Sequence, residues 1–270
     1  MTTPPLPAHL TKHLPTLYYP LPSTPYILTL TQSQSSSSST SSEQTTGTTL
    51  WLSSQLLSYH LLTLFPSSPS TPQRSRGVAI DLGAGIGLTS HTLSHLNFRV
   101  YATDVPAITS GILSQNISQN ANLPAGGVPI VAHALDWTLP LSPADVPWSR
   151  EEVEVIVTAD TFYKLELVEP LVRTIRGLCV ESARCAEKRG GGRRKRYPLV
   201  LVAVEVRDRG VLGAALETAA REGFECRRIG DGRVKKGLEA AGVRWGREEW
   251  EGGEIWRWVF KGEGSERESG

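Results

Sequence analysis

The chain has 270 residues, 39% of them hydrophobic, and a formal net charge of +1. This length allows one large domain with a sizeable core, and the composition argues against a disordered chain. The near-neutral charge argues against a protein that binds polyanions over a broad surface, and no apolar run reaches the roughly 18 residues that a membrane helix needs.

Three cysteines, Cys179, Cys185 and Cys226, occur without a CxxC pair. An odd number without that spacing argues against a disulfide framework or a structural zinc site and favours reduced thiols in an intracellular protein. Prolines interrupt the N-terminal segment and no apolar stretch follows, so no secretory signal is expected. We expect the protein in the cytoplasm, with the nucleus as a further location.

The N-terminal 76 residues carry only four charged side chains, Lys12, Glu43, Arg74 and Arg76. Within them, TLYYPLPSTPYILTLTQ is rich in aromatic and β-branched residues, which predicts two short strands. The following stretch, SQSSSSSTSSEQTTG, is of low complexity and predicts a flexible surface loop. We therefore expect residues 1–47 to form an extension ahead of the main domain.

The segment TLWLSSQLLSYHLLTLF predicts an amphipathic helix that begins near Trp51, because its apolar residues recur at near-helical spacing. From residue 77 on, short apolar strands alternate with helices, which predicts a doubly wound α/β fold with a mostly parallel sheet. Strands are expected at 77–82, 98–104, 127–137, 152–160, 197–206, 224–229 and 254–260, and helices at 87–96, 107–120, 164–188, 209–223 and 232–242.

A basic segment, KRGGGRRKRY at residues 188–197, joins the long helix to the fifth strand. Such a run can be a nuclear address or a nucleic-acid patch, but a solvated loop is the favoured interpretation. We expect the main domain to span residues 48–262 and residues 263–270 to form a disordered tail. No nucleic-acid or membrane partner is expected, and a monomer is expected.

The turn VAIDLGAGIGLTS, residues 78–90, brings three glycines between a strand and a helix. It lacks the lysine of a phosphate-binding P-loop. It also departs from the GxGxxG dinucleotide pattern, because Leu88 occupies the place of the third glycine. A tight turn without a ligand remains an alternative at this point.

Acidic residues around this turn favour a cationic ligand. Asp104 ends the second strand, 19 residues after Gly85, where a carboxylate can bind ribose hydroxyls. Asp81 directly precedes the glycines, and a carboxylate there would repel a pyrophosphate but attract an ammonium group. S-adenosyl-L-methionine carries an ammonium and a sulfonium and no phosphate, so the electrostatics favour this methyl donor over a dinucleotide.

Four acids follow predicted strands: Asp81, Asp104, Asp136 and Asp160. Ligands of open α/β sheets bind outside the carboxyl ends of the strands, so these acids should share one edge of the sheet. Burying them without cationic or hydrogen-bonding partners would be costly. Their clustering supports a cationic ligand and is compatible with a cationic substrate.

With these segments in order, the sequence resembles the class I, seven-stranded S-adenosylmethionine-dependent methyltransferases, and within them the family 16 lysine methyltransferase-like group. The resemblance covers about residues 48–260 and implies a Rossmann-like sheet of seven strands with one late antiparallel strand. Its motifs are TLWLSSQLLSYHL, VAIDLGAGIGLTS, VYATD, ILSQNISQN, ALDW and VIVTADTFYKLELVEPLV. The departures are Asp81, where glutamate is commoner, and Thr161-Phe162 inside the D-x-x-Y segment.

The resemblance also implies roles. Glycine-turn backbone lies close to the donor, Asp81 holds its amino-acid end, and Asp104 binds the ribose. Asp136 and Trp137 lie beside the adenine, and Trp51 covers the methionine portion unless it is a core residue at a helix start. The implied cofactor-binding residues are Trp51, Asp81, Gly83, Ala84, Gly85, Asp104, Asp136, Trp137 and Ala159, and the implied catalytic residues are Asp160 and Tyr163.

The leading functional hypothesis is a protein-lysine methyltransferase acting on a protein substrate, with translation machinery as a candidate. A small-molecule N-methyltransferase and a catalytically silent donor-binding module are the alternatives, and a dehydrogenase is a distant one. No metal site is expected. His91 and His95 are four apart, but without an HExxH glutamate they are expected to be surface histidines.

Overall fold

The computed structural model describes residues 4–22, 24–33, 46–66, 75–122, 128–142, 145–148, 151–188 and 196–262. Most of the predicted serine-rich loop, most of the basic loop and the predicted tail lie outside these residues. Across the part that is described, no helix is long and apolar enough to span a lipid bilayer.

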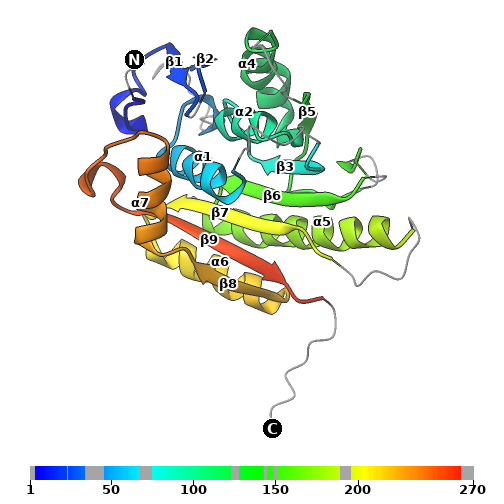
Figure 1. The fold of residues 1–270 in the computed structure, drawn as a ribbon. Helices are drawn as coiled ribbons and strands as arrows, with labels where there is room; N and C mark the ends of the chain where they lie inside the picture. The colour runs from blue at the N-terminus through cyan, green and yellow to red at the C-terminus, as the bar shows by residue number, and fades with distance from the viewer. Residues whose placement is uncertain are drawn as a thin grey trace, which may run out of the picture.

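A seven-stranded sheet forms the centre of the molecule, in the order β5-β4-β3-β6-β7-β9-β8 (Figure 1). Only β9 runs antiparallel to its neighbours, β7 and β8. The predicted doubly wound sheet with one late antiparallel strand is therefore confirmed. Its strands are β3 (Val78–Leu82), β4 (Arg99–Asp104), β5 (Ile130–Ala134), β6 (Val153–Ala159), β7 (Leu199–Glu205), β8 (Phe224–Arg228) and β9 (Gly253–Phe260).

Alternate residues of each strand point to opposite faces of the sheet. Both faces are apolar, and helices cover each of them. Ala79 packs in one hydrophobic cluster with α1 (Leu52–Leu64), α2 (Leu88–His95) and α7 (Asp231–Ala240). Its neighbours in β3, Val78 and Ile80, pack in a second cluster with α5 (Val168–Lys188) and α6 (Arg209–Arg221). The strands are apolar on both sides, as expected of central parallel strands.

The strand order reverses between β3 and β6, because the chain runs outward through β4 and β5 and then returns to the other side of β3. A crevice at the carboxyl ends of the strands is expected at such a reversal. Asp81 near the end of β3 and Asp160 directly after β6 are therefore brought to the same edge.

The helix predicted over residues 107–120 is interrupted. It consists of α3 (Pro106–Ile108), a wide π-helical turn (Thr109–Leu113) and α4 (Ser114–Gln119). Gly111 adopts φ −101° and ψ −110° inside this stretch, a conformation outside the helical region. The sequence pattern predicted its helical character but not the break.

The predicted N-terminal strands form an antiparallel hairpin of β1 (Thr16–Pro20) and β2 (Ile27–Thr31). Leu28 and Leu30 of the hairpin belong to the same hydrophobic cluster as α1. The two asparagines of the ILSQNISQN motif fasten it from α4: Thr31 N donates to Asn116 Oδ1 at 2.8 Å and Thr29 N to Asn120 Oδ1 at 2.9 Å. The N-terminal extension is thus packed onto the main sheet layer.

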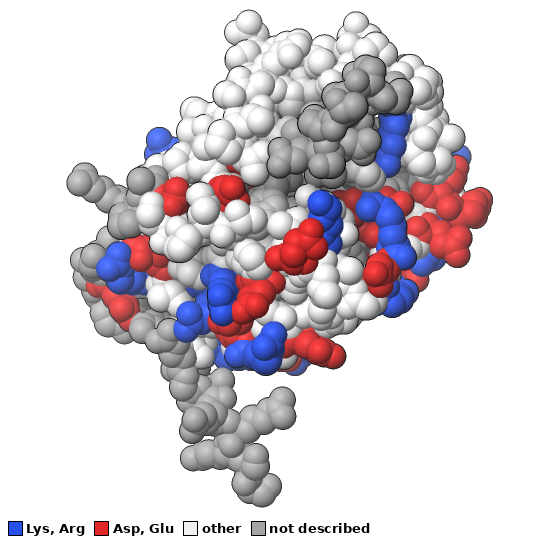
Figure 2. Space-filling view, turned by 180° about the vertical axis from the view of Figure 1, so that it is seen from behind, with Lys and Arg blue, Asp and Glu red and all other residues white. Residues whose placement is uncertain are grey.

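The far end of the chain meets this extension, since the Trp245 indole donates to the Pro5 carbonyl at 3.1 Å. The region formed by the hairpin and α4 is almost free of charge, whereas charged side chains gather over the rest of the face seen in Figure 2. The charge-poor N-terminal sequence therefore forms a part of the surface with few charges, on which large side chains such as Tyr18 and Ile27 are exposed.

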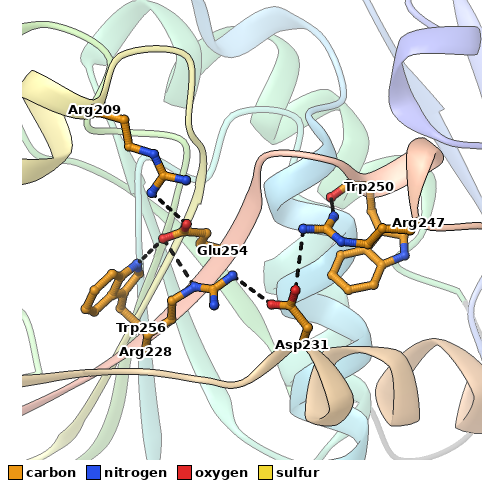
Figure 3. Close-up of polar contacts among 7 residues, drawn as sticks. All are labelled: Arg209, Arg228, Asp231, Arg247, Trp250, Glu254 and Trp256. Atoms are coloured by element: carbon orange, nitrogen blue, oxygen red, sulfur yellow. Dashed lines mark hydrogen bonds and ion pairs between the residues drawn. The ribbon is translucent and has the colours of Figure 1, made fainter.

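A charged network lies beside the ends of β7 and β9 (Figure 3). Glu254 of β9 is only 5% exposed and accepts hydrogen bonds from Arg209 at 2.8 Å and from the Trp256 indole at 3.0 Å. Arg228 bridges Glu254 to Asp231, with N···O distances of 3.5 and 2.7 Å. The network fastens the starts of α6 and α7 to the antiparallel strand.

Candidate active site

A cavity of about 380 Å³ opens at the carboxyl edge of β3, β4 and β6. It lies where the strand order reverses, as the general rule for open α/β sheets requires. All predicted site residues except Asp136 line it. The lining comprises Gly47, Thr49, Trp51, Ser54, Asp81, Gly83, Ala84, Gly85, Ile86, Leu88, Thr89, Asp104, Val105, Ile108, Trp137, Ala159, Asp160, Thr161, Tyr163, Lys164 and Arg207.

The glycine turn forms one side of the cavity. Gly83 has φ +70°, which L-residues rarely adopt, and a Cβ there would lie 2.6 Å from Thr161 Cγ2 and 3.2 Å from the Trp137 ring. Gly85 has φ +55°, and a Cβ there would lie 3.1 Å from the Gly47 carbonyl oxygen. Both positions therefore require glycine for conformation and for space.

Asp104 is held against this turn. Its Oδ2 accepts from Gly85 N at 2.9 Å and its Oδ1 from Val105 N at 2.8 Å. The side chain is 7% exposed, and burial raises its pKa to about 6 despite these two hydrogen bonds. Each carboxylate oxygen keeps a second acceptor site that a ligand hydroxyl can use.

Asp81 is more deeply buried, with 1% of its surface exposed. The Ser90 hydroxyl donates to its Oδ2 at 2.6 Å. Burial raises its pKa to about 7, the Ser90 bond opposes this shift, and the charge of Asp104 adds to it. No cation is paired with either acid among the ion pairs of the described residues.

These features fit S-adenosylmethionine. Two buried carboxyl groups whose pKa values are raised by burial would be stabilised in their ionised form by a cationic ligand. Ile86, Ile108 and Trp137 supply apolar walls for an adenine ring and a thioether chain. The glycine turn lines the cavity with backbone that carries no side chain at Gly83 and Gly85.

The opposite side of the cavity, called here the β6–β7 side, comprises Trp51, Asp160, Tyr163 and Arg207. Asp160 adopts φ +59°, an uncommon conformation outside glycine that Asp and Asn tolerate best. Its Oδ2 pairs closely with the Arg207 guanidinium, and its Oδ1 accepts from Glu205 N at 3.2 Å. Burial raises the pKa of Asp160, while Arg207 acts to lower it.

Trp51 begins α1 and contributes its ring to this side. The Arg207 guanidinium carbon lies 4.8 Å and the Lys12 Nζ 3.6 Å from the centroid of the ring. Trp51 therefore lies at the cavity wall rather than in the core, and its predicted role over the methionine portion of the donor stays a prediction.

Arg207 and Lys12 were not predicted. Arg207 follows β7, so the rule that identified Asp160 after β6 would have found it. Lys12 carries no such signal, because only the folded chain brings it to Trp51.

Asp136 lies outside the lining of the cavity. Its Oδ1 accepts from Thr138 N at 2.9 Å and from the Thr138 hydroxyl at 2.6 Å, which closes the turn that carries Trp137. In the structure Asp136 therefore positions the Trp137 loop, and its predicted place beside the adenine stays a prediction.

His91 differs from the expectation of a surface histidine. It is 8% exposed, and burial lowers its pKa to about 4. Among the described residues, no group of three or more His, Cys, Asp or Glu side chains could hold a metal ion. The three cysteines are free thiols.

The fold, the glycine turn and the acidic strand ends together define a donor-binding α/β protein of the methyltransferase type. The sequence model of the family described as lysine methyltransferase matches residues 32–196. The chain belongs to this family, and this match confirms the predicted family.

Individual known proteins are similar to this chain over a smaller share of its length. Mouse protein-lysine methyltransferase METTL21E is 33% identical over 136 residues, which is 50% of this chain and 53% of that protein. Human methyltransferase-like protein 22 is 33% identical over 111 residues, covering 36% of this chain and 27% of that protein. The chain thus spans about half, or less, of the length of these relatives.

Among solved structures, the glycopeptide N-methyltransferase MtfA aligns with a TM-score of 0.46 and 11% identity, over 76% of this chain and 90% of that one. A TehB-like SAM-dependent methyltransferase from Corynebacterium glutamicum aligns with a TM-score of 0.45 and 14% identity, over 76% of this chain and 88% of that one.

Proposed function

We propose that this chain transfers a methyl group from S-adenosylmethionine to a lysine side chain of a protein substrate. The observation that carries this proposal is that one cavity holds two buried acids beside the glycine turn together with Asp160, paired with Arg207, and the aromatic side chains of Trp51 and Tyr163. Membership of the lysine methyltransferase family supports it.

When bound, S-adenosylmethionine supplies an electrophilic methyl carbon on a sulfonium centre. Asp81 would hold the ammonium group and Asp104 the ribose hydroxyls, with Trp137 and Ile108 excluding water from the adenine. Transfer by direct displacement needs little acid–base catalysis, so the chain acts mainly by positioning the two reactants.

The acceptor amine must be neutral to react, whereas a lysine in water has a pKa of about 10.4. The aromatic walls around Trp51 and Tyr163 would favour the neutral amine by desolvation, and Asp160 would oppose this. We assign to Asp160, fixed by Arg207 and Glu205 N, the orientation of the amine, and to water the removal of its proton. Tyr163 would form a wall or donate a hydrogen bond.

We propose the cytoplasm, with the nucleus as a further location, and a monomer as the active form. Translation machinery is the first substrate class to test. A small-molecule N-methyltransferase would need the same donor side, so the acceptor must be identified directly.

The test incubates the full chain with a cell extract and methyl-labelled S-adenosylmethionine, then separates proteins from small molecules. Hydrolysis of the labelled proteins should yield methyl-lysine. Label found only in the small-molecule fraction would contradict the proposal, and calorimetry that detects no S-adenosylhomocysteine binding would remove its basis. The same assay is run with Asp160→Asn, which keeps the left-handed backbone conformation, removes the charge and should label the proteins far less.

A further inference from the structure

Lys12 is the first lysine of the sequence, and the next is Lys164. The fold brings both to the active site: Lys164 lines the cavity, and Lys12 Nζ lies 3.6 Å from the centroid of the Trp51 ring, which also lines it. A chain that methylates lysine therefore holds one of its own amines against an aromatic ring that lines its cavity.

A buried glutamine fixes the turn that carries Lys12. Gln32 is 4% exposed, and its Nε2 donates to the carbonyls of Thr11 at 2.9 Å and Leu14 at 2.8 Å. Its Oε1 accepts from Leu50 N at 2.6 Å, in the residue before Trp51. One side chain thus clamps the Lys12 turn to the start of the Trp51 helix, so their juxtaposition is built into the core.

The surroundings of Lys12 resemble those proposed for a substrate amine. Burial lowers its pKa, Glu205 and Asp160 act to raise it, and Arg207 acts to lower it. Its neighbours therefore include the carboxylate to which we assign the orientation of the amine, an aromatic face, and a cation that disfavours a second positive charge.

We propose that Lys12 is a methyl acceptor of this same active site, so that the chain methylates itself. The proposal rests on the proposed function. In the step, the lone pair of the neutral Lys12 amine forms an N–C bond to the donor methyl as the S–C bond breaks. The electron pair of the S–C bond stays on sulfur and S-adenosylhomocysteine is the product. The proton released to water is the one that the Lys12 ammonium loses before the attack, so the nitrogen becomes a methylated ammonium. The methylated ammonium keeps its charge and gains methyl groups that pack on an aromatic face.

The main test uses the full chain, first as purified from cells and then after incubation with labelled S-adenosylmethionine in the absence of any extract. Peptide mass spectrometry should find added methyl groups on Lys12 and at least tenfold less on Lys164. Absence of methyl groups from Lys12 in both samples would overturn the proposal. If extract proteins are still labelled in that case, the proposed function stands and only this inference fails.

Two variants sharpen the assignment. Lys12→Arg keeps a cation over Trp51 but removes the acceptor, so self-labelling should fall at least tenfold. Lys235→Arg, on the exposed face of α7, is the matched control and should leave self-labelling unchanged. The rate of self-labelling per chain should also stay constant when the protein is diluted a hundredfold. A rate per chain that falls in proportion to dilution would mean transfer between molecules and would overturn methylation within one chain.

A readout independent of methyl transfer is the reactivity of the amine itself. Trace acetylation with acetic anhydride across a pH series should show Lys12 becoming reactive at a lower pH than Lys235, because burial disfavours its charged form. A profile at or above that of Lys235 would remove the neutral amine that the transfer requires and would overturn the proposal.

Discussion

The two sides of the cavity are assembled from very different stretches of chain. The glycine-turn side is continuous, since Asp81, the glycines and Asp104 all lie within two neighbouring strands and the turn between them. The β6–β7 side joins Trp51, Asp160 and Arg207 from separate elements, with Lys12 added from the N-terminal extension. Motifs in the sequence identify the residues of the first side and Trp51, Asp160 and Tyr163 of the second, whereas the contacts of Arg207 and Lys12 with Trp51 exist only in the folded chain.

The two sides also differ in how their charges are compensated. Asp81 and Asp104 are buried with hydrogen-bond donors but no cation, and burial raises the pKa of each. Asp160 has a guanidinium partner in Arg207. The glycine-turn side thus favours a cationic ligand, whereas on the β6–β7 side the carboxylate of Asp160 already has a cationic partner.

The largest effect is expected from a side chain in the glycine turn. Gly83→Val forces a branched residue to φ +70° and into Thr161 and Trp137, so S-adenosylhomocysteine binding should weaken by about 100-fold or more. Calorimetry measures this, with circular dichroism to confirm folding. Gly213→Ala in α6, where an added Cβ meets nothing within 4 Å, is the control and should bind normally. Normal binding by a folded Gly83→Val would show that the donor lies elsewhere.

Next, Asp160→Asn tests whether the two sides have separate roles. Methyl transfer should fall about 100-fold because the charge that orients the amine is lost, whereas the affinity for S-adenosylhomocysteine should change less than about threefold. Single-turnover rates and calorimetry on the same preparation measure the two quantities. Asp231→Asn, in the network of Figure 3, serves as the control. If affinity for S-adenosylhomocysteine fell by the same factor as the rate, Asp160 would take part in donor binding and the two sides would not have separate roles.

Removing Glu254 tests how much the charged network of Figure 3 contributes to the free energy of unfolding. Glu254→Ala leaves Arg209 and Arg228 without their shared carboxylate, and because both arginines are partly exposed we expect a loss of about 2 kcal/mol in the free energy of unfolding. Urea unfolding measures it. Glu239→Ala removes an exposed pair on α7 and should cost only about 0.3 kcal/mol. Equal losses would show that the network contributes no more than a surface pair.

The smallest effect expected is the pH dependence of donor binding. Both acids have pKa values above their ordinary value of 3.8 in the folded chain, about 7 for Asp81 and about 6 for Asp104. They therefore stabilise the free protein below about pH 4, and this contribution is lost as the pH rises through 6 to 7. The ammonium group of S-adenosylhomocysteine favours the ionised forms, so its affinity should rise about tenfold from pH 5.5 to 7.5, with protons released.

Calorimetry in two buffers of different ionisation enthalpy detects that release. Ser90→Ala removes the hydrogen bond that holds down the pKa of Asp81 and should move the midpoint of the pH profile upward. Ser94→Ala on the same helix, where the hydroxyl bonds the Val128 carbonyl, should not move it. A flat profile for the unmodified chain would mean that neither acid faces the ligand's charge.

Much of this molecule could be predicted from its sequence because its rules are local. The apolar pattern predicted the strands. The position of acids at or just after the strand ends predicted that Asp81, Asp104 and Asp160 lie at one edge of the sheet. The direction of a side chain is not local: Asp136 follows its strand like the others, yet it turns to Thr138. The clamp made by Gln32 likewise depends on tertiary contacts that no pattern in the sequence records.

The position of β9 has a consequence for how the chain folds. It is the last of the described strands in chain order, yet it lies between β7 and β8, and β8 has no other partner in the sheet. During synthesis β8 must therefore wait without a neighbour until β9 has left the ribosome. The hydrogen bond between Trp245 and Pro5 likewise cannot form until Trp245 has been synthesised, so this contact of the N-terminal extension is also made late. Completion of the sheet is thus a late, long-range step, of the kind that is slow and prone to aggregation.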